Sequence, residues 1–111
     1  AVHWALEASA QLKEYSIEIL DLRSLLPWDK EAVRSAVKKT GKVLVFHEDC
    51  YTGGVGGEIA AWIAEHCFEF LDAPVKRTAS LDTPVPFSIP LEQNFLPKQR
   101  IIQDLLKLLN Y

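Results

Sequence analysis

The sequence predicts an α/β fold, namely a three-layer α/β/α sandwich around a mostly parallel sheet. Strand-like runs alternate along the chain with stretches of helical periodicity. The continuous β-prone run at 43–46 is typical of a strand buried on both faces, as in a parallel sheet covered by helices. A length of 111 residues, 49% of them hydrophobic, fits a single domain of ordinary globular composition.

The first part of the chain is expected to contain two helices and one short strand. Residues 2–14 are rich in Ala, Leu, Glu and Lys and place apolar residues one helical turn apart, which indicates an amphipathic helix. Residues 16–22 alternate apolar and polar side chains before Pro27, so we expect a short strand that leads into a loop. Asp29 is a good N-cap for a second helix, which Gly41 ends.

The middle of the chain is expected to contain the buried strand and a third helix. The strand at 43–46 ends at the polar residues 47–49. A glycine-rich turn at 53–57 then leads into a helix, because apolar residues recur after it at helical spacing, at Ile59, Trp62 and Ile63.

The last part of the chain is expected to contain a strand, a loop and a final helix. Residues 75–78 follow Pro74 and have strand-forming composition. A loop with several prolines at 82–90 leads to a helix that starts near Pro97. The apolar residues of that helix form a wide stripe, so we expect the sheet and a neighbouring subunit to cover it.

The start of the chain departs from this pattern. In an α/β sandwich a helix normally follows a strand, but the helix expected at 2–14 has neither a strand before it nor a capping residue. We therefore expect residues 1–111 to form a single domain that lacks its first strands.

Composition and charge exclude several function classes. The net charge is −3 and the isoelectric point is near 5.6, so we expect neither nucleic acid nor a membrane as a partner. No apolar run reaches the roughly 18 residues of a membrane-spanning helix, and the first residues do not resemble a signal peptide. The expected location is the cytoplasm of a bacterium or an organelle matrix. Cys50 and Cys67 form no metal-binding motif and are expected to be free thiols.

The carboxyl end of the buried strand is the first place to look for a functional site, because loops converge there in open α/β sheets. His47 and Glu48 lie at this end and could carry protons or bind a ligand. We favour a role in which Glu48 accepts backbone N–H bonds at a helix start and His47 lies in an interface. A metal site or a Cys–His nucleophile is not expected, because adjacent residues of an extended segment point in alternating directions. The zinc motif HExxH is also absent, since Tyr51 stands at its second histidine.

Four glycines follow this strand, and two roles are open for them. Gly53, Gly54, Gly56 and Gly57 resemble a phosphate cradle, since helix N-termini and glycine backbones attract anions. They match neither the dinucleotide pattern GxGxxG nor the phosphate-binding loop with its lysine. Close backbone packing at a subunit boundary explains them as well, and we favour this second role.

The loop that contains Asp82, Pro84 and Pro86 is stiff and apolar and holds few residues able to do chemistry. Its prolines fix the path of the chain at low entropic cost, and the aromatic side chain of Phe87 suits a contact surface. A simple connector is the other interpretation of this loop.

Five segments together carry a family resemblance. They are Val43-Leu44-Val45-Phe46-His47-Glu48, Thr52-Gly53-Gly54-Val55-Gly56-Gly57-Glu58-Ile59, Leu71-Asp72-Ala73-Pro74-Val75-Lys76-Arg77, Asp82-Thr83-Pro84-Val85-Pro86 and Phe95-Leu96-Pro97. In this order they resemble the transketolase C-terminal domain in the beta subunit of thiamine-diphosphate-dependent 2-oxo acid dehydrogenases. Related thiamine enzymes share the strand, the glutamate and the glycine turn, whereas the segments at 72–75 and 82–86 are specific in combination.

The resemblance implies a mixed five-stranded sheet between helices, with two strands ahead of the first helix of this chain. In that family thiamine diphosphate and magnesium bind between the alpha-type half and the preceding domain of the beta-type half. No catalytic, cofactor-binding or metal-binding residue is therefore carried over to this chain. The implied role is to support an enzyme that decarboxylates a 2-oxo acid and reductively acylates a lipoyl group, with the cofactor performing the carbanion chemistry.

The resemblance also implies partners and a substrate class. The partners are an alpha-type subunit or half, a second beta-type half, and the subunit-binding domain of an acyltransferase. Tyr111, with acidic neighbours such as Asp104, would contact that domain. His47-Glu48 followed by Thr52-Gly53-Gly54 is closer to branched-chain than to pyruvate dehydrogenases. Two alternatives remain, namely an autonomous anion- or nucleotide-binding module and the equivalent domain of another thiamine enzyme.

Overall fold

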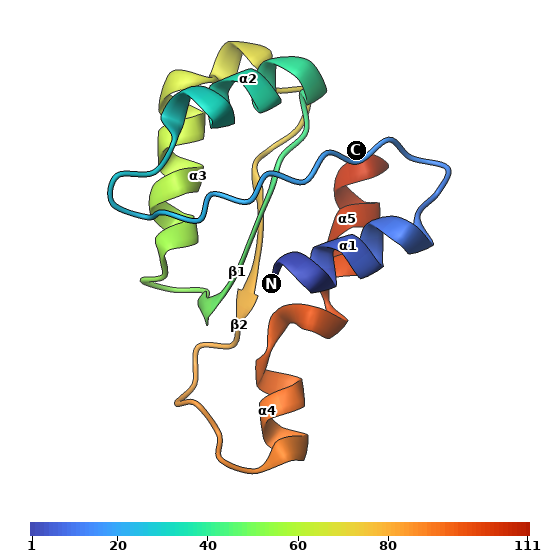
Figure 1. The fold of residues 1–111 in the computed structure, drawn as a ribbon, viewed down its shortest axis with the longest axis vertical. Helices are drawn as coiled ribbons and strands as arrows, with labels where there is room; N and C mark the ends of the chain where they lie inside the picture. Colours follow the sequence, from blue (N-terminus) through green and yellow to red (C-terminus); the bar gives the residue numbers. More distant parts are fainter.

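Two parallel strands form the centre of the fold, and helices lie on both sides of them (Figure 1). The computed structural model describes all 111 residues, Ala1 to Tyr111. Its helices and strands are, in chain order, α1 (Val2–Gln11), α2 (Lys30–Thr40), β1 (Leu44–Cys50), α3 (Val55–His66), β2 (Lys76–Ser80), α4 (Ile89–Phe95) and α5 (Ile101–Leu109). Short 3-10 turns lie at Phe68–Phe70 and Pro97–Gln99. The α/β class that the sequence predicts is confirmed.

Side chains of β1 and of the residue before it alternate between the two helical layers. Val43 and Val45 pack against a core cluster from α2, α3 and the residue after α3, made of Val33, Val37, Ile59, Ile63 and Cys67. Leu44 and Phe46 pack against the opposite cluster, from α1, its C-cap and α5, made of Ala8, Leu12, Ile101 and Leu105. Because successive residues of a strand point to opposite faces, β1 lies in the middle layer of a three-layer α/β/α sandwich.

The register of the two strands is regular at first and then shifts. Leu44 lies opposite Lys76 and Phe46 opposite Thr78, but an irregularity separates Phe46 from Cys50, which pairs with Ser80. β1 is therefore longer than the run that the sequence predicts. The polar residues expected to follow the strand belong to its irregular last part.

Both ends of α2 match the sequence prediction. Asp29 Oδ1 accepts a hydrogen bond from the backbone N–H of Ala32 at 2.9 Å, which satisfies one free donor of the first turn. At the other end Gly41 has a φ of +71°, and its N–H donates to Val37 O at 2.8 Å. A Cβ at Gly41 would collide with the carboxylate of Asp72, so glycine is required there for two reasons.

The strand predicted at 16–22 is wrong, because this segment is extended but belongs to no sheet. Its side chains alternate between partly buried and exposed from Ser16 to Leu20, as they would in a strand. Ile17 and Leu22 pack against the two opposite core clusters. However, its backbone makes no hydrogen bond to β1 or β2. A strand needs a neighbour within hydrogen-bonding distance, and a groove separates this segment from β1.

Three helix predictions need correction. The first helix, α1, ends at Gln11 instead of residue 14, because a turn follows in which Tyr15 N donates to Leu12 O. α4 lies partly within the segment predicted to be a loop, and it carries Pro90 in its first turn, where an N–H is not needed. The final helix, α5, starts at Ile101 after a 3-10 turn.

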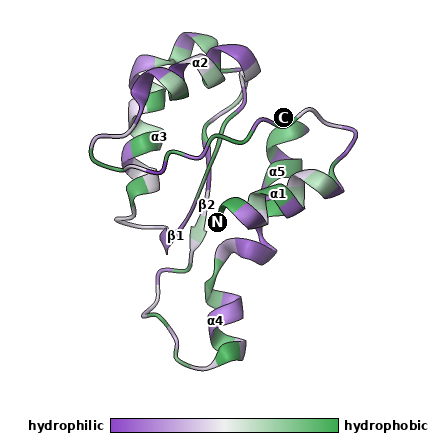
Figure 2. Cartoon of the chain, viewed as in Figure 1, coloured by the Kyte–Doolittle hydropathy of each residue, from purple (hydrophilic) through white to green (hydrophobic).

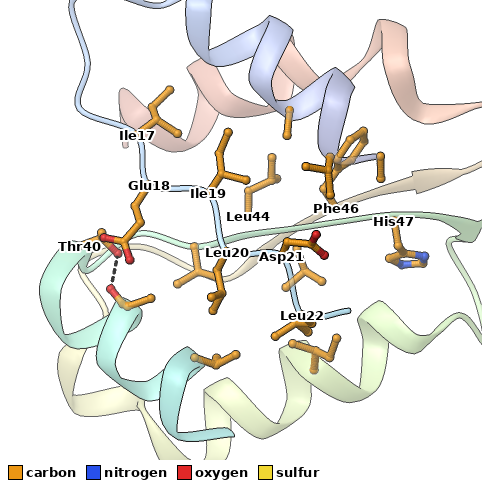
Figure 3. Close-up of a pocket in the computed structure, with 18 of the residues that line it drawn as sticks. Ile17, Glu18, Ile19, Leu20, Asp21, Leu22, Thr40, Leu44, Phe46 and His47 are labelled. Carbon is orange, nitrogen blue, oxygen red and sulfur yellow. Dashed lines mark hydrogen bonds between the residues drawn. The ribbon is translucent and has the colours of Figure 1, made fainter. Parts of the chain in front are cut away.

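The groove between the extended segment and β1 has a volume of about 560 Å³ and is lined by 30 residues, 22 of them hydrophobic. Residues 17–22 of the extended segment and Leu44, Phe46 and His47 of β1 are among the lining residues drawn in Figure 3. The core is thus divided into two clusters with an open apolar strip between them.

The hydropathy of α2 and α3 agrees with their position in an outer layer of the fold. Figure 2 shows hydrophilic and hydrophobic residues alternating along α2 and α3, as expected for helices with one buried face. None of the helices combines the length and the apolar composition that a bilayer crossing requires.

Candidate functional site

The last part of β1 and the loops that follow both strands bring most of the predicted site residues together. His47 and Glu48 lie in the last part of β1, and the glycine turn 53–57 comes shortly after it. Asp82 follows β2 and contacts Thr52. The loops after the two strands therefore meet at one edge of the sheet, as expected for parallel strands.

The ring of His47 packs directly against the glycine turn. An ideal Cβ on Gly54 would lie 2.7 Å from His47 Cε1, and one on Gly56 would overlap Nε2. Side-chain carbons do not approach other atoms so closely, so glycine is required at Gly56 while the ring keeps its place. At Gly54 a Cβ would also overlap the backbone oxygen of Cys50, so glycine is required there whatever the position of the ring. The structure explains these two glycines by packing within the chain, whereas a subunit boundary here stays a prediction.

Burial favours the neutral form of His47. Both ring nitrogens are buried and have no hydrogen-bond partner in the protein. Burial lowers the pKa of His47 below its usual value, with smaller effects from Asp49, which raises the pKa, and Arg77, which lowers it. No hydroxyl or thiol is hydrogen-bonded to the ring, so His47 does not form the nucleophile–base pair of covalent catalysis.

Glu48 links β1 to the start of α1. Its Oε1 lies 2.7 Å from the terminal ammonium nitrogen of Ala1, the residue before α1, and the two groups form an ion pair. Its backbone oxygen accepts from the hydroxyl of Ser80 in β2. The Glu48 side chain is 52% exposed, so the carboxylate lies at the surface and is not part of a buried acid–base pair.

Arg77 is a residue of this edge that sequence analysis missed. Its Nη1 donates to Tyr51 O at 3.0 Å, and its guanidinium carbon lies 4.0 Å from the centre of the Tyr51 ring. The same Nη1 would lie 3.4 Å from a Cβ on Gly57. Gly53, by contrast, has a φ of +79° and no atom near its Cβ position, so the backbone turn alone explains this glycine. The feature of the sequence that could have indicated Arg77 is its positive charge within a segment of strand-forming composition.

Asp82 holds the two loops together. Its carboxylate accepts from the backbone N–H of Thr52 at 2.7 Å and from the Thr52 hydroxyl at 2.6 Å. These bonds, the hydroxyl first, lower the pKa of Asp82 below its usual value. Asp82 thus acts as a loop-organising residue, because an ionised carboxylate with these bonds fixes the start of the loop.

The loop that begins at Asp82 presents an apolar surface to solvent. Pro84 and Pro86 lie in this loop, and their side chains can neither donate nor accept hydrogen bonds. Pro86 is partly buried. Large apolar side chains around them are exposed, with fractions of 64% for Val85, 102% for Phe87 and 69% for Ile89. Figure 1 shows this loop and α4 at one end of the molecule, away from α2.

Tyr111 does not belong to this edge. The end of α5 contacts the start of β1, where Lys42 Nζ donates to Leu109 O at 2.8 Å. Tyr111 is 74% exposed and so is free to contact a partner. Asp104, expected to assist it, is instead engaged within the chain, because its side chain is only 16% exposed and Oδ2 accepts from the Thr78 hydroxyl at 2.7 Å.

No group of three or more His, Cys, Asp or Glu side chains is close enough to hold a metal ion. The two cysteines are free, Cys67 buried and Cys50 partly buried. Cys50 Sγ makes only a long contact of 3.8 Å with Thr83 O. The arrangement can therefore order loops at the edge of the sheet, but its residues do not converge on a reacting atom.

A model of the family described as "Transketolase, C-terminal domain" matches residues 1–102. The chain is 46% identical over 103 residues to "2-oxoisovalerate dehydrogenase subunit beta 2, mitochondrial" of Arabidopsis thaliana, covering 92% of the chain and 28% of that relative. It is 45% identical over 98 residues to "2-oxoisovalerate dehydrogenase subunit beta" of Bacillus subtilis, covering 86% and 30%. It is 41% identical over 111 residues to "Pyruvate dehydrogenase E1 component subunit beta" of Staurastrum punctulatum, covering 97% and 34%. The chain therefore spans about a third of the length of these curated relatives.

Proposed function

The chain belongs to the family of transketolase C-terminal domains, and from this premise we propose that it is the C-terminal domain of the beta subunit of a thiamine-diphosphate-dependent 2-oxo acid dehydrogenase. The observation that carries the proposal is the family match over residues 1–102, together with relatives named as beta subunits of such enzymes. The parent enzyme oxidatively decarboxylates a 2-oxo acid and acylates a lipoyl group.

The contribution of this domain is structural. His47 is wedged against glycines, Asp82 is bonded to Thr52, and Arg77 is bonded to Tyr51, so the polar residues of the edge already have roles in ordering loops. An edge stiffened in this way suits a surface that must keep its shape against other subunits. We therefore propose that the isolated domain has no turnover of its own.

Thiamine diphosphate and magnesium are the cofactors that the family implies. The residues of this chain do not fit a magnesium site, because no cluster of carboxylates or histidines converges. They do not fit a diphosphate at the glycine turn either, since the His47 ring fills the space beside Gly54 and Gly56. We assign both cofactors to other domains of the parent enzyme, and no step of the chemistry to residues of this chain.

Three partners follow from this role. They are an alpha-type subunit or half, a second beta-type half, and the subunit-binding domain of an acyltransferase. The exposed side chain of Tyr111 supports the last of these contacts. The apolar side chains of the loop after Asp82 support a contact with a subunit. Relatives include mitochondrial and bacterial proteins, so we propose a mitochondrial matrix or bacterial cytoplasmic location.

The groove beside β1 supports the proposal that the sheet of this domain is completed by further strands. One edge of β1 pairs with β2, while the extended segment 16–22 has no ladder partner. The groove between them is apolar, as is the site of a strand buried on both faces. A strand placed there would pair with both neighbours and satisfy their free backbone groups.

A branched-chain 2-oxo acid is the proposed substrate class. Relatives named 2-oxoisovalerate dehydrogenase and a relative named pyruvate dehydrogenase are all similar to this chain, with somewhat higher identity for the first two. This supports a preference for branched-chain 2-oxo acids over pyruvate, as do His47-Glu48 and Thr52-Gly53-Gly54 in the sequence.

The test is to produce the full beta subunit that contains residues 1–111 with its alpha-type partner and to measure thiamine-dependent decarboxylation. We expect faster turnover with 3-methyl-2-oxobutanoate than with pyruvate, and none from the isolated chain. Turnover of pyruvate alone would reject the substrate class. Absence of thiamine-dependent decarboxylation in the assembled enzyme would reject the function itself.

An autonomous anion- or nucleotide-binding module is the weaker candidate. The turn at 53–57 would need free space beside its glycines to take a phosphate, and His47 occupies it. No observation in the structure favours this function over the dehydrogenase role.

A further inference from the structure

The exposed face of α2 carries a row of cations. Lys30, Arg34 and Lys38 follow one another at four-residue spacing and so lie along one stripe of the helix. Lys39 is a fourth cation of α2, and Glu31 is the one acidic residue of the helix. α2 therefore has a net charge of +3 in a chain whose net charge is −3. This basic stripe, Lys30–Arg34–Lys38, is the strongest local departure from the acidic character of the chain.

Aromatic side chains of neighbouring segments support the basic stripe. Lys30 Nζ lies 5.6 Å from the ring centre of Trp28 and 5.9 Å from that of Trp62. Arg34 Cζ lies 5.4 Å from the Trp62 ring, and Lys38 Nζ lies 4.9 Å from the Phe70 ring. These distances are within the range of about 6 Å for cation–π attraction.

This support reduces the freedom of three long side chains before any partner arrives. Lysine and arginine each lose about 2 kcal/mol of rotamer freedom when they are held in one position. An aromatic row beneath them restrains them in the free protein, so less freedom is lost on binding.

The charges of the basic stripe are largely unpaired within the chain. Lys30 and Lys38 have no carboxylate within 4.0 Å. The one carboxylate near Arg34 is that of Glu31, at the limiting distance of 4.0 Å, and Arg34 Nη1 also donates to His66 O at 3.4 Å. Lys39, on a different side of α2, shows the contrast, because its Nζ pairs with Glu18 at 2.6 Å. The nearby Glu65 contacts His66 instead of the stripe, at 3.9 Å. The cations thus remain available to an external anion.

We propose that the basic stripe docks an acidic helical segment of a partner protein, with Asp or Glu at four-residue spacing. Two turns of helix separate Lys30 from Lys38, about 12 Å at 1.5 Å per residue, and a partner helix with carboxylates at the same spacing matches all three cations. A nucleic acid fits less well. The stripe would cover only about three or four phosphates of one strand at 3.4 Å each, and the rest of the chain is acidic.

This inference is independent of the dehydrogenase reaction. The stripe lies on α2, in the layer that α2 and α3 form on one side of β1, whereas Tyr111 follows α5 in the opposite layer. Loss of binding at the stripe would therefore leave the proposed thiamine-dependent turnover unchanged.

The test uses the full protein that carries this chain and a fluorescently labelled helical peptide with Glu at three positions four residues apart. Anisotropy measured at low salt should show binding that weakens by about tenfold or more at 0.5 M salt. The same peptide with Gln in place of Glu should not bind. Absence of binding by the Glu peptide, or equal binding of both peptides, would overturn the proposal.

Variants locate the site. Lys30→Gln with Lys38→Gln should weaken binding of the Glu peptide by about tenfold, whereas the control Lys13→Gln with Lys107→Gln, which removes the same charge, should change it by less than about twofold. Lys30→Glu with Lys38→Glu should bind a peptide with Lys at the three positions, a gain that misfolding cannot produce. Equal losses in both Gln variants, or tighter binding of an oligonucleotide of equal charge, would overturn the proposal in favour of unspecific polyanion attraction.

Discussion

The imidazole of His47 occupies the space that a side chain at Gly56 would need. An ideal Cβ on Gly56 would overlap His47 Nε2, although Gly56 lies in the first turn of α3, where alanine is usually preferred to glycine. β1 and α3 therefore approach each other closely, because the His47 ring of β1 packs against the backbone of Gly56 in α3. This close approach sets the position of the glycine turn and so of the whole carboxyl edge.

Gly56→Ala should destabilise the chain despite its helical position. We expect a loss of about 1–3 kcal/mol in the free energy of unfolding, from overpacking against His47, where propensity alone would give a gain of about 1 kcal/mol. Urea titration measures this change. The same substitution in a His47→Ala background should regain most of the loss. A loss of equal size in both backgrounds would contradict packing against His47 as the cause.

Stability should fall on acidification through the titration of His47. Because burial lowers its folded pKa below the unfolded value of about 6.5, the unfolded chain binds more protons in the window between the two values. The contribution of His47 is therefore fully present above about pH 6.5 and is lost as the pH falls toward the folded pKa. Urea titrations at pH 7 and pH 5 measure it, and His47→Gln should make the fall smaller. An unchanged fall would contradict the assignment of this pH dependence to His47.

Asp82→Asn should loosen the link between the loops after β1 and β2. The carboxylate of Asp82 accepts two hydrogen bonds from Thr52, and the amide of asparagine can accept them only in part. Hydrogen exchange at the Thr52 amide should become about tenfold faster. Because these bonds lower the folded pKa of Asp82, the same loosening should occur in the unchanged chain as the pH falls through that pKa, below about 4. Asp21→Asn is a control, and equal exchange in both variants would contradict the role of Asp82.

Elements with strong local signals could be predicted from the sequence. α2 has a capping aspartate before its first turn and a glycine after its last, and the structure contains both contacts. The continuous β-prone run predicts the buried strand, and the alternation of strands and helices predicts its parallel pairing with β2. The extended segment 16–22 could not be assigned correctly, because its alternating pattern reports burial of side chains but not the presence of a hydrogen-bonding neighbour. The sequence does not predict α4, because Pro90 and the prolines of the preceding segment favour a loop.

The candidate site was predictable in its location but not in its contacts. The carboxyl edge of parallel strands follows from topology, so His47, the glycine turn and Asp82 could be selected from the sequence. The partner of Asp82 is Thr52, 30 residues away, and the position of Arg77 over Tyr51 depends on side-chain packing between two loops. Such contacts have no signal in a single sequence. The hydrogen bond between Asp104 and Thr78 could not be predicted for the same reason, since an acidic residue on a helix gives no sign of the buried threonine that it contacts.

Thr78→Val tests whether Asp104 is part of the core of the chain or part of a partner surface. Thr78 is only 2% exposed, and its hydroxyl donates to Asp104 Oδ2 at 2.7 Å while Lys76 Nζ lies 3.6 Å from Oδ1. Removing the hydroxyl leaves a mostly buried carboxylate oxygen without its donor, so we expect a loss of about 1–3 kcal/mol in the free energy of unfolding. Thr83→Val, at an exposed threonine, should cost less than about 0.5 kcal/mol. Thermal or urea unfolding distinguishes the two variants. The opposite result would be that Thr78→Val is as stable as the control and that Asp104→Asn weakens only the binding of a partner. Asp104 would then belong to the interface, and its bond to Thr78 would not stabilise the contact between β2 and α5.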